Sequence, residues 1–350
     1  MSANYITALT GLRGIAAWWV VFYHFREALS LPADSFLNLL LRNGHLAVDL
    51  FFVLSGFVVF ISYGDRFSKV DSRSYSRFVL KRLARIYPLH LFVLLLFLLD
   101  PLAVYLFSSV KSLAAYDPLY YLASLFLVQN WGWFDVPIWN VPAWSISTEL
   151  GAYLIFPFAA VFVKRYFNHA GWHVVCVFVL CIVFSLAFFL GGYTSIGAGI
   201  VEMGLFRCIV EFSVGLILGH YYFSKGWKGS FFYSYGIALA LMLVFCSVVF
   251  DIPDYIFVVP VCVLIIAAFS GSNPQFGFVL SSRVFLYLGE ISYSTYLIHY
   301  WIKGWIKFAS DESDILHFFV YAVSVLLASH VLYRFVEVPG RLLHYKVFSD

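Results

Sequence analysis

Long apolar stretches recur along this chain, and they limit its possible folds more than any other feature. A helix needs about 20 residues to cross about 30 Å of hydrocarbon, and a spanning backbone must satisfy its own hydrogen bonds. The short alternating segments of a membrane β-barrel are absent. We therefore expect an all-α, polytopic transmembrane helix bundle of about ten spans, near residues 12–29, 45–63, 86–110, 138–163, 172–190, 203–223, 231–250, 254–271, 285–303 and 315–336.

Composition supports the membrane class and argues against others. Of the 350 residues, 62% are hydrophobic and 12% are charged, which leaves too little polar surface for a water-soluble globule of this size. The net charge of +3 does not imply a nucleic-acid partner. The five cysteines show no paired spacing and no nearby histidine cluster, so we expect no metal site. Without internal repeats or hydrophilic appendages, residues 1–350 are expected to form a single membrane domain.

The basic residues predict the orientation of the bundle. The densest basic run follows the second predicted span and should be cytoplasmic, which places both termini in the cytoplasm if there are ten spans. A further apolar stretch near residues 119–134 is interrupted by polar residues, and an eleventh span there would break this agreement. We expect it to be a re-entrant or interfacial segment at the outer surface. The basic run comprises Arg66, Lys69, Arg73, Arg77, Lys81, Arg82 and Arg85.

Two ionisable residues lie within the first predicted span. Charge inside a bilayer is costly, so such residues are candidates for function. Arg13 and His24 are eleven residues apart, which puts them on nearly one helix face and about 16 Å apart. This geometry suits a substrate with an anionic head at the inner surface and a reactive end within the membrane, such as acyl-CoA. The alternatives are a snorkelling cation for Arg13 and an interhelical hydrogen bond for His24.

Further polar residues occur in the second and fourth spans. Asp49 should lie just below the outer surface, where it could pair with a base or bind a sugar hydroxyl. Ser55, beside a glycine, is expected to permit close helix packing. Glu149, in the sequence WSISTE, should lie near mid-membrane at the depth of His24. A carboxylate there could orient the imidazole for proton removal, or form a structural ion pair.

Arg82 and Arg85, in the sequence RLARIYP, are one helical turn apart and could bind one phosphate or diphosphate. Taken singly, each of them is better explained by a purely topogenic role. Arg207 and Glu211 are predicted to form a buried pair. His299 is out of phase with Glu290, so we expect no joint site between those two.

Several ordered motifs together resemble the membrane acyltransferase-3 family. They are TGLRGIAAWWVVFYH, DLFFVLSGF, RLARIYP, WSISTE, LGEISYSTYLIH and FVEVPGR, and the resemblance runs from about Tyr5 to Arg341. The resemblance implies an inner-membrane bundle that O-acylates an extracytoplasmic carbohydrate or glycolipid from cytoplasmic acyl-CoA. This chain has Ser-Thr-Glu-Leu where family members often carry two consecutive acidic residues, so a second carboxylate is missing there.

The resemblance also assigns roles to matching residues. Arg13, Arg82 and Arg85 would bind the donor, acetyl-CoA by expectation, and His24 would be the general base, supported by Glu149. Asp49 completes the predicted catalytic set. The bilayer and a carbohydrate or glycolipid acceptor are the expected partners. The alternative function is a secondary transporter of a sugar or organic anion, although the repeat symmetry typical of transporters is not visible; a pure scaffold ranks third.

Overall fold

The computed structural model describes residues 6–108, 116–226, 231–271, 274–310 and 314–347, and all regular structure in them is helical. The long helices are α1 (Thr7–Phe25), α3 (Ala47–Tyr63), α4 (Ser72–Leu96), α7 (Trp144–Tyr166), α8 (Ala170–Leu190), α9 (Ile200–Lys225), α10 (Phe231–Val249), α11 (Asp254–Ser270), α14 (Ser292–Ala309) and α15 (Ile315–Leu332). The shorter ones are α2 (Phe36–Arg42), α5 (Leu99–Phe107), α6 (Pro118–Leu125), α12 (Pro274–Leu280), α13 (Arg283–Glu290) and α16 (Val338–Val347). The all-α prediction is confirmed.

Each predicted apolar stretch overlaps one of these long helices. By length and composition, five helical segments of the described residues can cross a membrane: Phe36–Arg66, Ser72–Phe107, Val141–Tyr166, Ala170–Leu190 and Ile315–Leu342. Other helices are apolar but shorter, such as α11 with 17 residues. The chain is thus a multi-pass membrane protein, while the number of ten crossings stays a prediction.

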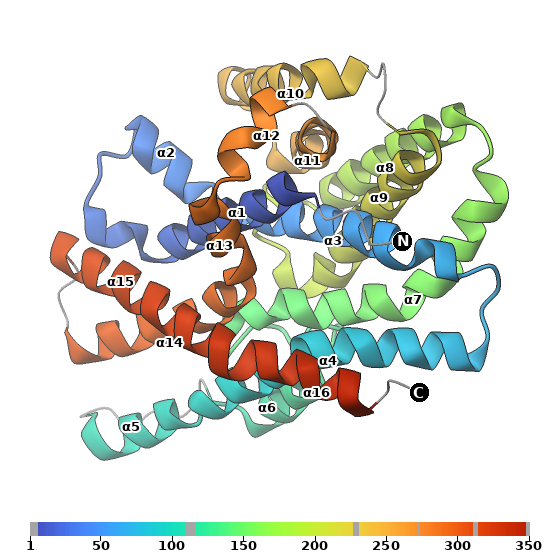
Figure 1. Ribbon diagram of the computed structural model, residues 1–350. Coiled ribbons are helices and arrows are strands. Elements are labelled where there is room, and N and C mark those ends of the chain that lie inside the picture. Colours follow the sequence, from blue (N-terminus) through green and yellow to red (C-terminus); the bar gives the residue numbers. More distant parts are fainter. Residues whose placement is uncertain (1–5, 109–115, 227–230, 272–273, 311–313, 348–350) are drawn as a thin grey trace.

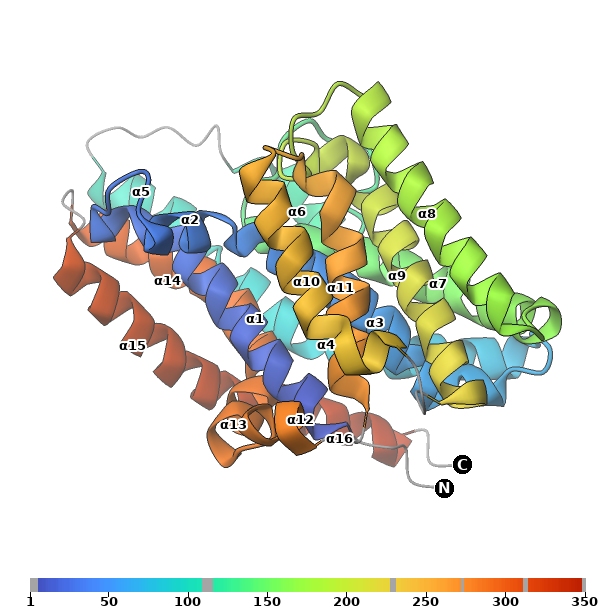
Figure 2. The ribbon, with the colours of Figure 1, turned by 90° about the horizontal axis from the view of Figure 1, so that it is seen from above.

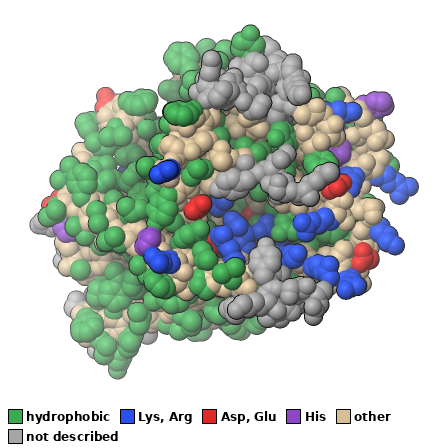
Figure 3. Space-filling view, viewed as in Figure 1, with side chains coloured by type: hydrophobic (Ala, Val, Ile, Leu, Met, Phe, Trp, Pro, Cys, Tyr) green, Lys and Arg blue, Asp and Glu red, His purple; other side chains and the backbone are tan. Residues whose placement is uncertain are grey.

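Both described ends of the chain lie at the same end of the bundle (Figures 1 and 2). The short helices α12 and α13 lie at this end too, whereas α2, α5 and α6 lie at the opposite end (Figure 2). Lys and Arg side chains gather over the centre and right of the face that carries the chain ends (Figure 3). The arrangement agrees with an even number of crossings and with a basic face on the side of the termini.

Local sequence explains where several helices begin. Asp71 precedes α4 and accepts hydrogen bonds from the backbone N–H groups of Arg73 and Ser74, as N-cap residues do. The hydrogen bonds from Ser74 hold the pKa of Asp71 below its usual value. Asp117 caps α6 in the same way, with Pro118 in the first helical position. These acidic caps mark the ends of loops that connect the long helices.

The segment expected to dip into the outer surface does not form a span. Its helix α6 has only eight residues, and the chain beyond it packs inward. The Gln129 and Asn130 side chains are buried and donate hydrogen bonds to the carbonyls of Ala143, at 3.1 Å, and Ile200, at 2.9 Å. Irregular backbone at membrane depth is tolerated where it is buried in protein. Among the described residues, this segment contains no helix long enough to cross a membrane, and its interfacial or re-entrant position stays a prediction.

Helices α3 and α9 cross at close range, which requires a glycine at the crossing. A Cβ added at Gly56 would lie 2.0 Å from the carbonyl oxygen of Phe212. Small residues allow such backbone approach between membrane helices. The crossing matters for function because α3 carries both Asp49 and Ser55.

Gly56→Val is therefore expected to disrupt the fold. Overpacking typically costs about 1–3 kcal/mol, and here the obstacle is backbone, which cannot rotate away. Thermal unfolding in detergent, read by size-exclusion fluorescence, measures the loss. Gly304→Val in α14 is the matched control, since a Cβ at Gly304 meets no atom within 4 Å. Equal stability of the two variants would contradict the close crossing.

Candidate active site

A cavity of about 500 Å³ lies among α1, α3, α4, α7 and α14, and it contains most of the predicted site residues. Arg13, Arg82, Arg85 and Glu149 come from three helices and all line it, together with Arg66. The structure thus brings together the three predicted donor-binding arginines and one predicted catalytic carboxylate. Other polar lining residues are Thr10, Ser55, Ser62, Tyr63, Ser145, Tyr153, Ser292, Tyr293 and Tyr296.

Arg82 is held by aromatic rings and retains an unused donor. Its guanidinium lies over the rings of Tyr63, at 5.5 Å, and Tyr153, at 5.2 Å. The side chain is 8% exposed, and among the described residues its Nε has no hydrogen-bond partner. Buried polar groups normally have partners. An anion entering the cavity would supply one.

Arg13 is positioned by a close contact between α1 and α13. A Cβ at Gly289 would lie 1.9 Å from the carbonyl oxygen of Thr10, so only glycine permits this approach. Arg13 then donates a hydrogen bond to Ser292 Oγ at 3.1 Å, and Ser292 donates to the Gly289 carbonyl. The motif LGEISYS therefore fixes the arginine of the motif TGLRG.

Glu149 contacts two hydroxyl groups. Ser55 and Tyr153 both donate to its Oε1, the latter at 2.5 Å. Ser55 was expected to serve helix packing, but it lines the cavity, and Gly56 beside it makes the packing contact. The expected contact of Glu149 with His24 is also wrong, because depth along a helix does not fix the direction in which a side chain points.

The partner of His24 is a second histidine, His299 of α14. His24 Nδ1 lies 3.0 Å from the Val20 carbonyl oxygen and 3.3 Å from His299 Nε2. His299 is fully buried, and its Nδ1 lies 2.7 Å from the Tyr296 carbonyl oxygen. Tyr296 also lines the arginine cavity, so His299 lies about one helical turn beyond a lining residue.

Sequence reasoning missed the role of His299 because it considered only Glu290 as a partner for this histidine. A usable signal was present, since His299 ends the motif LGEISYSTYLIH and is as unusual in an apolar helix as His24.

Asp49 does not face an acceptor site. It is fully buried and accepts two hydrogen bonds of 2.7 Å, from Nε and one terminal nitrogen of Arg207. The predicted pair of Arg207 with Glu211 is present as well, at 3.9 Å. The expectation that Asp49 binds a sugar hydroxyl is wrong, because Arg207 occupies both carboxylate oxygens; the alternative of pairing with a basic group is correct.

The last motif, FVEVPGR, lies near the arginine cavity but does not line it. A π-helical turn at Tyr333–Glu337 buries Glu337, which accepts hydrogen bonds from Ser294 and Arg341. Arg341 in turn interacts electrostatically with the cavity arginines Arg13, Arg82 and Arg85. The final helix thus adds another cation beside the cavity.

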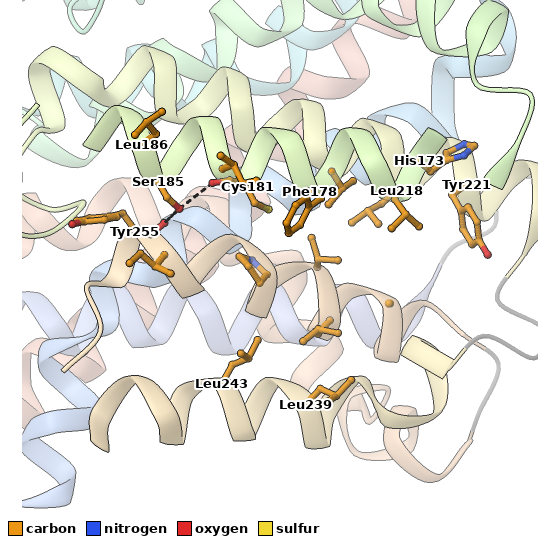
Figure 4. A pocket seen from close by; sticks show the side chains of 18 of the residues that line it. His173, Phe178, Cys181, Ser185, Leu186, Leu218, Tyr221, Leu239, Leu243 and Tyr255 are labelled. Atoms are coloured by element: carbon orange, nitrogen blue, oxygen red, sulfur yellow. Dashed lines mark hydrogen bonds between the residues drawn. The ribbon is translucent and has the colours of Figure 1, made fainter. Parts of the chain in front are cut away.

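A second, larger cavity of about 860 Å³ lies between α8, α9, α10 and α11. Its walls are almost entirely apolar, with side chains such as Phe178, Leu218 and Leu243 (Figure 4). Ser185 points its hydroxyl at the carbonyls of Cys181 and Tyr255 and is thereby satisfied. This cavity contains none of the predicted site residues. The described residues also include no group of three or more potential metal ligands.

Comparison with known proteins adds a family match. The model of the acyltransferase-3 family, described as an acyltransferase domain, matches residues 6–334. Acyltransferase MdmB of Streptomyces mycarofaciens is 29% identical over 322 residues, which cover 85% of this chain and 79% of that protein. O-acetyltransferase OatA of Staphylococcus aureus strain NCTC 8325 / PS 47 is 26% identical over 383 residues, which cover 99% of this chain.

The alignment with OatA covers 59% of that relative, so the chain spans about three fifths of its length. A putative O-acetyltransferase of Staphylococcus aureus strain COL is 22% identical over 372 residues, with 97% of this chain and 58% of that protein covered. No solved structure matches.

Proposed function

The chain belongs to the acyltransferase-3 family, and from this premise we propose that it transfers an acyl group, acetyl by expectation, from cytoplasmic acyl-CoA to a hydroxyl of an extracytoplasmic carbohydrate. The similarity to an acyltransferase and to O-acetyltransferases supports the O-acyltransferase class. The observation that carries the donor assignment is a cavity lined by four arginines. Its lining residue Tyr296 contacts His299, which in turn contacts His24.

The charge of the cavity suits the donor. Acyl-CoA carries several phosphate groups, and arginine forks bind phosphate through two parallel hydrogen bonds. Arg66 is exposed at the basic face, while Arg82 is buried further in. A volume of about 500 Å³ falls within the usual range of small-molecule sites. We place the phosphates at Arg66, Arg82 and Arg85, with both chain termini on the same, cytoplasmic side of the inner membrane.

The part of the cavity near Tyr296 would bring the thioester towards the proposed base, His24. Arg13 lines the cavity and lies eleven residues before His24 on α1. The pantetheine arm would pass Arg13 and end at Tyr296, whose carbonyl holds His299. Glu149, with Ser55 and Tyr153, offers polar groups to the amides of that arm. Glu149 then acts on the donor rather than on His24.

At the end of this route His24 would be the general base. It removes the proton from the acceptor hydroxyl, whose oxygen attacks the thioester carbonyl, and the CoA thiolate leaves and takes up a proton. The rings of Tyr23 and Tyr300 meet the His24 ring edge-on, at centroid distances of 4.9 and 5.5 Å. Aromatic rings of this kind can pack against a sugar, which favours a carbohydrate acceptor.

The test is acyl transfer from labelled acetyl-CoA by membranes that contain the native chain, compared with Arg82→Gln. Loss of a charge-assisted hydrogen bond costs about 1.5–3 kcal/mol, so we expect the KM for the donor to rise about tenfold or more. Arg73→Gln is the control, since Arg73 belongs to the same basic run but is exposed and outside the cavity.

If the donor KM of Arg82→Gln is unchanged, the donor does not bind at Arg82, and the proposed donor site in this cavity is wrong. If native membranes label no glycan with any of several acyl-CoA donors, while they accumulate a labelled sugar or organic anion, the secondary transporter is the better assignment.

A further inference from the structure

The two histidines of the pair constrain each other's protons. A carbonyl oxygen only accepts hydrogen bonds, so a ring nitrogen within hydrogen-bond distance of a carbonyl must carry the proton. His299 Nδ1 lies 2.7 Å from the Tyr296 carbonyl oxygen and must therefore be N–H. In a neutral ring the other nitrogen, Nε2, then has a lone pair and can only accept.

That lone pair faces His24. His299 Nε2 lies 3.3 Å from His24 Nδ1, which also lies 3.0 Å from the Val20 carbonyl oxygen. Both neighbours of His24 Nδ1 are acceptors, so this nitrogen is the one that carries the proton. In the neutral imidazole Nε2 of His24 then keeps its lone pair.

We propose that His299 is a positioning residue, which acts together with the Val20 carbonyl to hold His24 in the Nδ1–H tautomer, so that His24 Nε2 is the basic atom of the transfer. The proposal rests on the function proposed above, since it assigns the atom that acts there. His24 Nε2 takes the proton from the acceptor hydroxyl as the new C–O bond forms and the C–S bond breaks. The imidazolium then returns that proton to the CoA thiolate, which leaves as the thiol.

The location of the pair supports this role. His299 is fully buried, and the two imidazole rings are in contact, with centroids 5.0 Å apart and their planes tilted by 56°. His24 is only half-buried, so it can meet an acceptor while its partner cannot. His299 would orient His24 as the aspartate orients the histidine of a Ser-His-Asp triad. In that triad, loss of the correct histidine tautomer lowers kcat by about 10⁴.

The first experiment observes the tautomer directly and does not depend on activity. Solid-state NMR of the full chain with ¹⁵N-labelled histidine, in lipid bilayers, distinguishes protonated from unprotonated ring nitrogens. The His24 signals are assigned by their loss in His24→Ala. We expect a protonated Nδ1 and an unprotonated Nε2 for both His24 and His299. A proton on Nε2 of neutral His24 would overturn the proposal, whether or not the chain transfers acyl groups.

The second experiment separates positioning from mere packing. His299→Leu removes the side-chain acceptor and leaves only the Val20 carbonyl beside His24 Nδ1, whereas His299→Gln retains a side-chain oxygen that can accept from His24 Nδ1. We expect the leucine variant to lose about tenfold or more in kcat, less than the roughly 10⁴ of a fully wrong tautomer, with little change in the donor KM. The glutamine variant should recover part of this loss. His330→Leu, at an exposed histidine of α15, is the control.

The failures of the two proposals are distinguishable. Native activity in His299→Leu together with unchanged His24 signals would refute the role of His299 and leave the acyltransferase intact. Native activity in His24→Ala would instead refute the proposed base, whatever the tautomer.

Discussion

Replacement of His24 by alanine is expected to lower kcat for acyl transfer by about 100- to 10,000-fold, which is the usual contribution of a general base. The donor KM should change little, because the arginines that line the cavity are untouched and His24 is not among the lining residues. The measurement is steady-state transfer from labelled acetyl-CoA at matched amounts of folded protein. Added imidazole should restore part of the rate, since alanine leaves room for it beside His299.

The control for this prediction is His317→Ala. His317 contacts Asp314 at the start of α15, at the outer surface of the bundle and away from the cavity. Its replacement should leave kcat near the native value. Native kcat in His24→Ala would remove the proposed base.

The second large effect is structural. Asp49→Ala should destabilise the fold by about 3–5 kcal/mol, because it leaves Arg207 buried without its closest partner. Arg207 is 2% exposed, and the pair joins α3 to α9 through two hydrogen bonds of 2.7 Å. Thermal unfolding in detergent measures the change. The activity of this variant should fall in proportion to the amount of folded protein, while kcat per folded molecule stays near the native value.

A surface ion pair provides the matched control. Asp65 pairs with Lys164 at 3.5 Å but is 73% exposed, so Asp65→Ala should cost less than about 1 kcal/mol. Asp49→Leu combined with Arg207→Met should be no less stable than Asp49→Ala alone, since the pair is then removed together. If the Asp49→Ala variant is instead stable but inactive, this result would support the predicted catalytic role of Asp49.

The positions of the helices were predictable because a helix that crosses the hydrocarbon core must be long and apolar in its own sequence, whatever it packs against. Depth in the membrane stays a prediction, although the structure does bring Arg82 and Arg85 to one cavity. The direction of each side chain around its helix was not predictable, because it depends on which helices pack together. Glu149 therefore turned out to face Ser55, although its predicted depth matched that of His24.

The contacts that could not be predicted join residues far apart in the sequence. Asp49 and Arg207 are separated by 158 positions, and His24 and His299 by 275. No local pattern connects such pairs. Their common signal was chemical: each residue is ionisable and lies in an apolar helix, so each needed a partner. Asking which partners were available would have suggested both pairs.

The separation of His24 from His299 also affects how the protein is made. Ribosomes add about 5–20 residues per second, so α1 enters the membrane roughly 15–55 s before the 275 intervening positions have been synthesised. Arg13 likewise waits for Ser292. During insertion the nascent chain holds neither its oriented base nor its anchored arginine, and a prematurely released fragment that ends before α14 lacks both. The proposed reactive centre is thus assembled only after α14 has been synthesised.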